Sequence, residues 1–161
     1  MGASGRKGGG VVNACAPTVP GTDTRPATCR RHARPSRTWS LPRAARSART
    51  GRALVRTVLT AWRLDDLTDD ATVLVSELIG NAVEHTASDH VQVTVTRTRR
   101  DTVRIAVTDG SRTLPVRRDP DDTADRGRGL LLVEALSRRW GVDAQPRGKR
   151  VWGELTGEPH H

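Results

Sequence analysis

Aromatic side chains are almost absent from this 161-residue sequence, which has four Trp and neither Phe nor Tyr. A hydrophobic core must therefore be built from Val, Leu, Ile and Ala. The apolar fraction of 35% supports one core if those residues lie in one region. No apolar run approaches the roughly 18 residues that cross a membrane, or the stretch of about 7–15 residues in a signal peptide. We expect a cytoplasmic protein that has no membrane partner.

Cysteine and lysine are also scarce. The two cysteines, Cys15 and Cys29, form no CxxC pair, so the sequence predicts neither a structural disulfide nor a zinc site. Only Lys7 and Lys149 are lysines among 27 basic residues. A bias this strong towards Arg fits a GC-rich genome at least as well as a selected binding surface.

The net charge of +9 suggests a nucleic-acid partner, but its distribution argues against one. Residues 1–50 hold ten Lys or Arg against one acid, Asp23, whereas residues 51–161 hold 17 basic and 17 acidic residues. Base-stacking aromatics are missing near the basic segment, apart from Trp39. A nucleic-acid binder is therefore the least favoured interpretation, and we expect no direct contact with nucleic acid.

The residue patterns divide the chain into three parts. Residues 1–37 are rich in Arg, Gly and Pro and predict a disordered tail, residues 38–157 a folded domain, and residues 158–161 a short tail. The elements expected in the domain are a strand at 39–42, helices at 43–62, 68–86 and 129–139, and strands at 91–96, 103–107, 140–144 and 150–155. This order predicts an α+β fold: a two-layer sandwich with a mixed, mostly antiparallel sheet and helices on one face.

Two local signals refine these elements. Thr68 or Asp69 is expected to cap the second helix, whose first turn is acidic. The segment 109–127 has few apolar residues and predicts a long loop, which in a compact domain is usually functional or mobile.

The second helix carries a polar stripe formed by Glu77, Asn81, Glu84 and His85. A solvated face is the usual interpretation of such a stripe. However, Asn is unfavourable inside a helix, and a helix packed on a sheet would present this stripe to a polar cleft. His85, near the negative end of the helix dipole, fits a helix-terminal residue or a contact to the cleft better than a zinc ligand.

Two further motifs support a cleft. Asp109-Gly110 directly follows an apolar strand, and Gly127-Arg128-Gly129 directly precedes an apolar helix. Glycines at a helix N-terminus let backbone amides approach a phosphate, whose negative charge the helix dipole favours.

The segment 77–85, with sequence ELIGNAVEH, resembles the N box of the histidine-kinase-like (GHKL) ATPase superfamily. More narrowly, the chain resembles the short actinobacterial anti-sigma-factor serine kinases over about residues 38–156. The matching motifs, in the expected order, are the segments 39–42, 48–49, 107–109, 127–130, 139–141 and 148–152.

The resemblance implies a Bergerat-type fold that binds ATP and Mg²⁺. It implies that Asn81 is the Mg²⁺ ligand and Glu77 the general base, while Asp109 accepts a hydrogen bond from the adenine amino group. Gly127 and Gly129 would be the hinge of an ATP lid, and the amides near Gly129-Leu130 would face phosphate. For Arg128 we expect charge stabilisation of the transferring phosphoryl group.

The resemblance also implies a function and partners. The chain would be an anti-sigma factor that binds a sigma factor and phosphorylates Ser or Thr of an anti-anti-sigma (antagonist) protein, with homodimerisation through the sheet edge or first helix. Ser111 and Thr113 replace glycines of the family's Asp box, and Lys149-Arg150 follows Gly148 where the family has Gly-Thr. These departures keep open a second interpretation, a degenerate protein-binding module of the same fold with weak or no ATP turnover.

Overall fold

The computed structural model describes residues 33–111 and 128–158. Residues 1–32 of the expected tail, most of the expected long loop and residues 159–161 lie outside the described residues. The elements are β1 (Ser36–Pro42), α1 (Ser47–Ala61), a 3-10 turn η1 (Asp65–Leu67), α2 (Thr68–His85), β2 (His90–Arg99), β3 (Thr102–Asp109), α3 (Arg128–Leu136), β4 (Arg139–Gln145) and β5 (Gly148–Thr156). No described helix is both long and apolar enough to cross a membrane.

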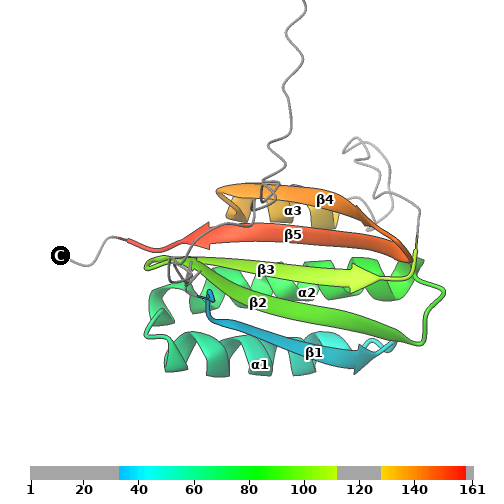
Figure 1. The fold of residues 1–161 in the computed structure, drawn as a ribbon, viewed down its shortest axis with the longest axis horizontal. Coiled ribbons are helices and arrows are strands. Elements are labelled where there is room, and N and C mark those ends of the chain that lie inside the picture. Colours follow the sequence, from blue (N-terminus) through cyan, green and yellow to red (C-terminus); the bar gives the residue numbers. More distant parts are fainter. Residues whose placement is uncertain (1–32, 112–127, 159–161) are drawn as a thin grey trace, which may run out of the picture. The chain divides into compact units, whose positions relative to one another are not determined.

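The strands form one five-stranded sheet in the order β1-β2-β3-β5-β4 (Figure 1). Each neighbouring pair is antiparallel, so the described strands contain no parallel pair. The hairpin between β2 and β3 turns at Arg100 and Asp101, as the sequence predicted. The expected mostly antiparallel sheet is therefore confirmed, although its described strands are wholly antiparallel and not mixed.

All three α-helices cover the same face of this sheet (Figure 1), which confirms the predicted two-layer α+β fold. Helix α2 contacts both α1 and α3 and packs on β3. Alternate residues of β2 and β3, all of them valines except Ile105, point into the core, where they meet Leu74, Val75, Leu78 and Ile79 of α2. The core therefore holds α2 in the middle of the helical layer, directly behind the central strand.

Helix α1 begins at Ser47, four residues later than predicted, because the chain after Pro42 first makes a turn. The Ser47 hydroxyl donates to the carbonyl of Pro42 over 2.5 Å. Ala45 and Ala53, whose spacing in the sequence suits the apolar face of the predicted helix, are both exposed. At Gly51 a Cβ would lie 2.3 Å from Cδ1 of Ile79, so a glycine lets α1 approach α2 closely.

Helix α2 also begins differently from the prediction. Its N-cap position is Leu67, and neither Thr68 nor Asp69 caps the helix with its side chain. The reason is η1, which leads directly into α2 and places Thr68 inside the helix. Asp69 and Asp70 lie in the first turn, where their charges favour the helix dipole.

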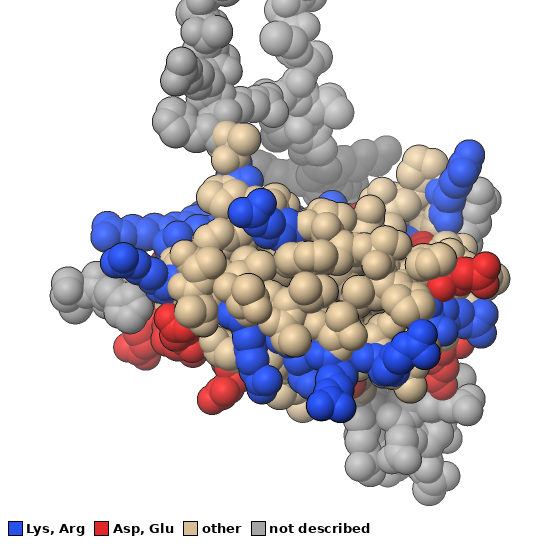
Figure 2. Space-filling model, turned by 90° about the horizontal axis from the view of Figure 1, so that it is seen from below, with Lys and Arg blue, Asp and Glu red and all other residues tan. Residues whose placement is uncertain are grey.

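The surface nearest to the viewer in Figure 2 is formed by the edge strand β1 and by helix α1, which lie lowest in Figure 1. Figure 2 shows a broad uncharged area there, bordered by Lys and Arg. A pocket on this side is lined in part by Trp39, Leu54 and Trp62, all of which are half-buried. The sheet edge and first helix remain the place where we predict a homodimer to form.

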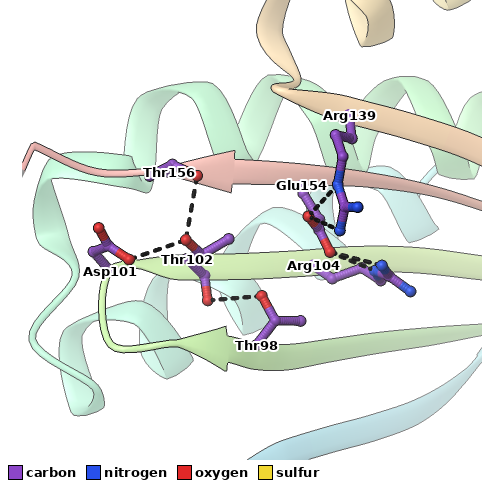
Figure 3. A network of polar contacts seen from close by, with 7 residues as sticks. All are labelled: Thr98, Asp101, Thr102, Arg104, Arg139, Glu154 and Thr156. Carbon is purple, nitrogen blue, oxygen red and sulfur yellow. Dashed lines mark hydrogen bonds and ion pairs between the residues drawn. The ribbon is translucent and has the colours of Figure 1, made fainter.

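The sheet face opposite the helices carries an ion-pair network centred on Glu154 (Figure 3). Arg104 of β3 and Arg139 of β4 each donate two hydrogen bonds to this carboxylate, over 2.7–3.0 Å. Arg104 also stacks on Trp152, 4.0 Å from the ring centroid. Burial alone would raise the pKa of Glu154, but the hydrogen bonds and charges of Arg139 and Arg104 outweigh it and hold this pKa below its ordinary value.

A Glu154→Gln variant should lose roughly 1.5–3 kcal/mol of unfolding free energy at pH 7, the usual contribution of hydrogen bonds to a charged group. Because the folded-state pKa of Glu154 is lowered, its contribution is complete above the unfolded pKa and is lost as pH falls through the folded pKa. The difference between wild type and variant should therefore shrink below about pH 4. Urea unfolding of both proteins at a series of pH values measures this difference in unfolding free energy.

The control for this experiment is Asp143→Asn, which removes an exposed carboxylate from the neighbouring strand β4. This variant should change stability by less than about 0.5 kcal/mol. A Glu154→Gln deficit that stays constant down to pH 3 would contradict the assignment of the ion pairs as its source.

Candidate functional site

Helix α2 positions Glu77 and Asn81 one turn apart on the same side. Both side chains are half-buried, next to fully buried Leu78 and Ala82. The other two residues of the predicted stripe differ from them. Glu84 and His85 are exposed, with 3.9 Å between the His85 Nε2 and a Glu84 carboxylate oxygen. The stripe therefore divides into a half-covered part, Glu77 and Asn81, and a surface part at the helix end.

The N-terminus of α3 meets the half-covered part of the stripe at Gly129. A Cβ at Gly129 would lie 2.8 Å from Oε2 of Glu77 and 3.5 Å from Oδ1 of Asn81. A glycine at this position thus lets the backbone of α3 approach both polar groups. The structure brings together three of the residues predicted for the site, Glu77, Asn81 and Gly129, from segments about fifty residues apart.

Helix α3 begins at Arg128, one residue before the start that the sequence predicted, so Gly129 lies within its first turn. The first four amides of an α-helix have no partner within the helix, so this turn offers donors and a positive dipole end to an anion. Leu130 follows with 7% exposure and anchors the turn in the core. Gly127 lies outside the described residues, and only the backbone of Arg128 is described.

The donor set at this place fits a nucleotide phosphate with Mg²⁺. Asn81 Nδ2 is buried and has no hydrogen-bond partner among the described residues. A buried donor left unsatisfied costs about 1–3 kcal/mol, and a phosphate oxygen would accept its hydrogen bond. Mg²⁺ prefers oxygen ligands and usually keeps waters and phosphate oxygens beside one or two protein groups. The side-chain oxygen of Asn81 could be such a group.

Asp109, the last residue of β3, lies near the end of α2. Its Oδ1 accepts a hydrogen bond from the Ser111 backbone N–H over 2.7 Å. The next residue, Gly110, donates its N–H to the Thr86 hydroxyl over 3.2 Å, which ties the strand end to the residue after α2. Sequence reasoning did not identify Thr86, because a threonine after a helix carries no distinctive signal.

The second carboxylate oxygen of Asp109 faces Lys149, which the sequence marked only as a departure from the family. Lys149 lies opposite Asp109 in the β3–β5 pairing, with 3.6 Å between its Nζ and Oδ2 of Asp109. The Lys149 side chain is 5% exposed and that of Asp109 is 1% exposed. Asp109 Oδ2 has no hydrogen-bond partner among the described residues. The two side chains form a buried ion pair at the end of the sheet.

Gly148 permits this arrangement, because a Cβ there would lie 1.8 Å from the backbone oxygen of Asp109. Ser111, which replaces a glycine of the family's Asp box, is 8% exposed. Among the described non-glycine residues only Arg63 has a positive φ, so Ser111 is accommodated without left-handed strain. Thr113, the other replacement, lies outside the described residues.

The domain is thus a helix-covered antiparallel sheet in which a polar helix stripe meets a glycine at the N-terminus of a second helix. The family model for the histidine kinase-like ATPase domain matches residues 41–153. The chain belongs to this family. The match includes Glu77, Asn81, Asp109, Gly129 and Lys149.

Among solved structures, the chain is similar to the crystal structure of the RsbU and RsbW domains of Rv1364c from Mycobacterium tuberculosis. The TM-score is 0.59 at 23% sequence identity, and the match covers 76% of this chain. It covers 32% of that chain, so the present protein spans about a third of it. This likeness concerns the fold. No curated protein matches the chain.

Proposed function

We propose that the protein binds ATP with Mg²⁺ and acts as an anti-sigma factor that phosphorylates Ser or Thr of an antagonist protein. The observation that carries this proposal is the close approach of Gly129, at the start of α3, to Glu77 and Asn81. Membership of the histidine kinase-like ATPase family supports the nucleotide. The N-box resemblance of residues 77–85 supports the regulatory role.

Each residue of the site has a proposed task in phosphoryl transfer. Asn81 would hold Mg²⁺ through its amide oxygen, and the metal would neutralise charge on the phosphates. The amides of the first turn of α3, from Gly129 on, orient the phosphates together with the helix dipole. For Arg128, the charge stabilisation expected from the sequence stays a prediction. These contributions are positioning and electrostatic stabilisation, which account for most of the catalysis of phosphoryl transfer.

Glu77 acts on the attacking hydroxyl. The Ser or Thr oxygen of the antagonist forms a bond to the γ-phosphorus, the bond from that phosphorus to the β–γ bridging oxygen breaks, and ADP leaves. The proton of the hydroxyl passes to the Glu77 carboxylate. The product side chain gains about −1.5 to −2 charge. A charge of this size would weaken the interface between the antagonist and this protein. Only the unphosphorylated antagonist would therefore compete with the sigma factor for binding.

Transfer of ³²P from γ-labelled ATP to candidate antagonist proteins tests this function. We expect Mg²⁺-dependent labelling that acid hydrolysis identifies as phosphoserine or phosphothreonine. Isothermal titration of the protein with ATP and Mg²⁺ is run in parallel. Heat of binding without labelling of any antagonist would favour the protein-binding module with little turnover. Absence of both heat and thermal shift at millimolar nucleotide would contradict ATP binding itself.

A further inference from the structure

A second pocket lies at the other end of the domain from the candidate site. It has a volume of about 540 Å³ and is formed by the end of α1, the β2–β3 hairpin and the residues after β5. These segments lie together at the left end of Figure 1. Strand β3 begins at this pocket and ends at Asp109, so its eight residues place the two sites roughly 25 Å apart.

Arginine side chains provide most of the charge in the lining, from Arg63, Arg97, Arg99 and Arg100. In residues 33–111 and 128–158, no carboxylate forms an ion pair with any of these four. The guanidinium of Arg97 donates to the backbone carbonyls of Trp62, Arg99 and Arg100. The other three guanidiniums form no hydrogen bond within the described part of the chain. Their charge is therefore available to a ligand.

Three acidic residues also line the pocket, Asp66, Asp101 and Glu158. Asp101 is engaged with its own neighbours: its Oδ1 accepts the Thr102 hydroxyl over 3.0 Å (Figure 3), and its backbone oxygen accepts the N–H of Gly157 over 2.8 Å. Asp66 packs on the same glycine, where a Cβ would lie 2.4 Å from its Oδ2. The acids thus hold the walls of the pocket together without neutralising the arginines.

Arg63 has a backbone conformation that favours glycine. Helix α1 ends in a Schellman motif, in which the Leu64 N–H donates to the Leu59 carbonyl over 2.9 Å and the Arg63 N–H to the Thr60 carbonyl over 3.1 Å. The residue at the position of Arg63 in this motif is usually glycine, because its φ is positive, and here φ is 57°. An arginine that has no side-chain partner yet occupies a strained position indicates a role outside the fold.

We infer that this pocket binds an acidic segment of a partner protein, with the Arg63 guanidinium as a carboxylate contact. Arginine binds carboxylates through two parallel N–H···O bonds, and Trp and Arg are enriched among the residues that dominate protein interfaces. Trp62 is half-buried and Leu64 is 2% exposed, so an apolar side chain between acidic ones suits the lining. Arg97 preforms the pocket, because it ties the hairpin to the end of α1. The inference does not depend on nucleotide binding.

The test titrates the ¹⁵N-labelled full chain with the pentapeptide EELEE and follows the amide signals of Arg99, Asp101 and Gly157. These signals report on the pocket, so peptide bound to the basic N-terminal residues does not contribute. In Arg63→Gly the affinity read from these signals should fall about fivefold, between the effects of an exposed ion pair and of a hydrogen bond to a charged group. The same variant should unfold about 2–6 °C higher, because glycine relieves the backbone strain. Weaker binding by a more stable protein cannot come from misfolding.

Two further variants serve as controls. Arg63→Lys keeps the charge but not the planar fork, and should lose less affinity than Arg63→Gly. Arg56→Gln removes an exposed arginine of the same helix that does not line the pocket, and should leave the affinity unchanged. A fivefold loss in Arg56→Gln as well would overturn the inference, since net charge alone would then explain the binding.

Other results would also overturn it. Equal affinity of wild type and Arg63→Gly for EELEE would remove Arg63 as a contact, and a lower unfolding temperature of Arg63→Gly would remove the argument from strain. A pentathymidylate that shifts the same signals and binds more tightly than EELEE would make the ligand a nucleic acid in place of an acidic protein segment. Loss of ATP binding in any of these proteins would concern the proposed function alone.

Discussion

Asn81→Ala should weaken the binding of Mg²⁺–ATP by about a hundredfold, because it removes the side-chain oxygen proposed to hold the metal and a buried donor for phosphate. The amide Nδ2 is buried without a partner among the described residues, so the free protein gains nothing from it. Isothermal titration with ATP, with and without excess EDTA, measures the effect. The wild type should lose affinity when Mg²⁺ is removed, whereas the variant should bind ATP equally weakly in both conditions.

Gly80→Ala is the matched control, one residue before Asn81 on the same helix. A Cβ at Gly80 would meet no atom within 4 Å. Replacing a glycine inside a helix by alanine stabilises the helix by roughly 0.5–1 kcal/mol, so Gly80→Ala should fold at least as well as wild type and bind ATP unchanged. If Asn81→Ala retained both the affinity and the Mg²⁺ dependence of the wild type, the assignment of the metal ligand would be wrong.

The spatial relation of Glu77 to Asn81 could be predicted from the sequence because it is local. Residues four apart lie on one side of a helix whatever the rest of the fold does. The prediction that this side faces a cleft used a further local argument, the cost of Asn inside a helix. Glu84 and His85 follow the same spacing but are exposed. Their exposure depends on where α3 and the sheet end, which periodicity does not describe.

The partnership of Lys149 with Asp109 could not be predicted, since it depends on the register between two strands forty residues apart. A shift of one residue in an antiparallel pair reverses which side chains face the core. That register is decided by the packing of residues such as Val107 and Val151 against α2 and its neighbours. The sequence therefore showed Lys149 only as an unusual residue.

The start of α2 illustrates a different limit. Thr68 and Asp69 have the side chains that favour an N-cap, and the local pattern supported either. In the fold, η1 already directs the chain into the helix, and Leu67 at the cap position is buried in the core. Burial of a leucine is worth about 1.5–3 kcal/mol, more than the roughly 1 kcal/mol of a typical cap. Tertiary packing thus overrides the local preference.

Glu77→Gln should reduce phosphoryl transfer to the antagonist by about 10²- to 10⁴-fold, the usual contribution of a general base, with Mg²⁺–ATP affinity nearly unchanged. Glutamine has the same shape and fits beside Gly129 as Glu77 does, but its amide does not accept the hydroxyl proton. Single-turnover transfer from labelled ATP measures the rate, and titration calorimetry measures the affinity. The two measurements separate a role in chemistry from a role in binding.

Asp69→Asn provides the control, since it makes the same substitution of amide for carboxylate at an exposed position of the same helix. Its transfer rate should match the wild type, apart from a small loss of stability as the helix dipole loses a favourable charge. Wild-type transfer by Glu77→Gln would remove Glu77 as the base. A loss of affinity as large as the loss of rate would place Glu77 among the groups that bind the nucleotide. Only a slow variant that still binds Mg²⁺–ATP supports proton acceptance by this carboxylate, because positioning of the nucleotide is then intact while the attacking hydroxyl is not activated.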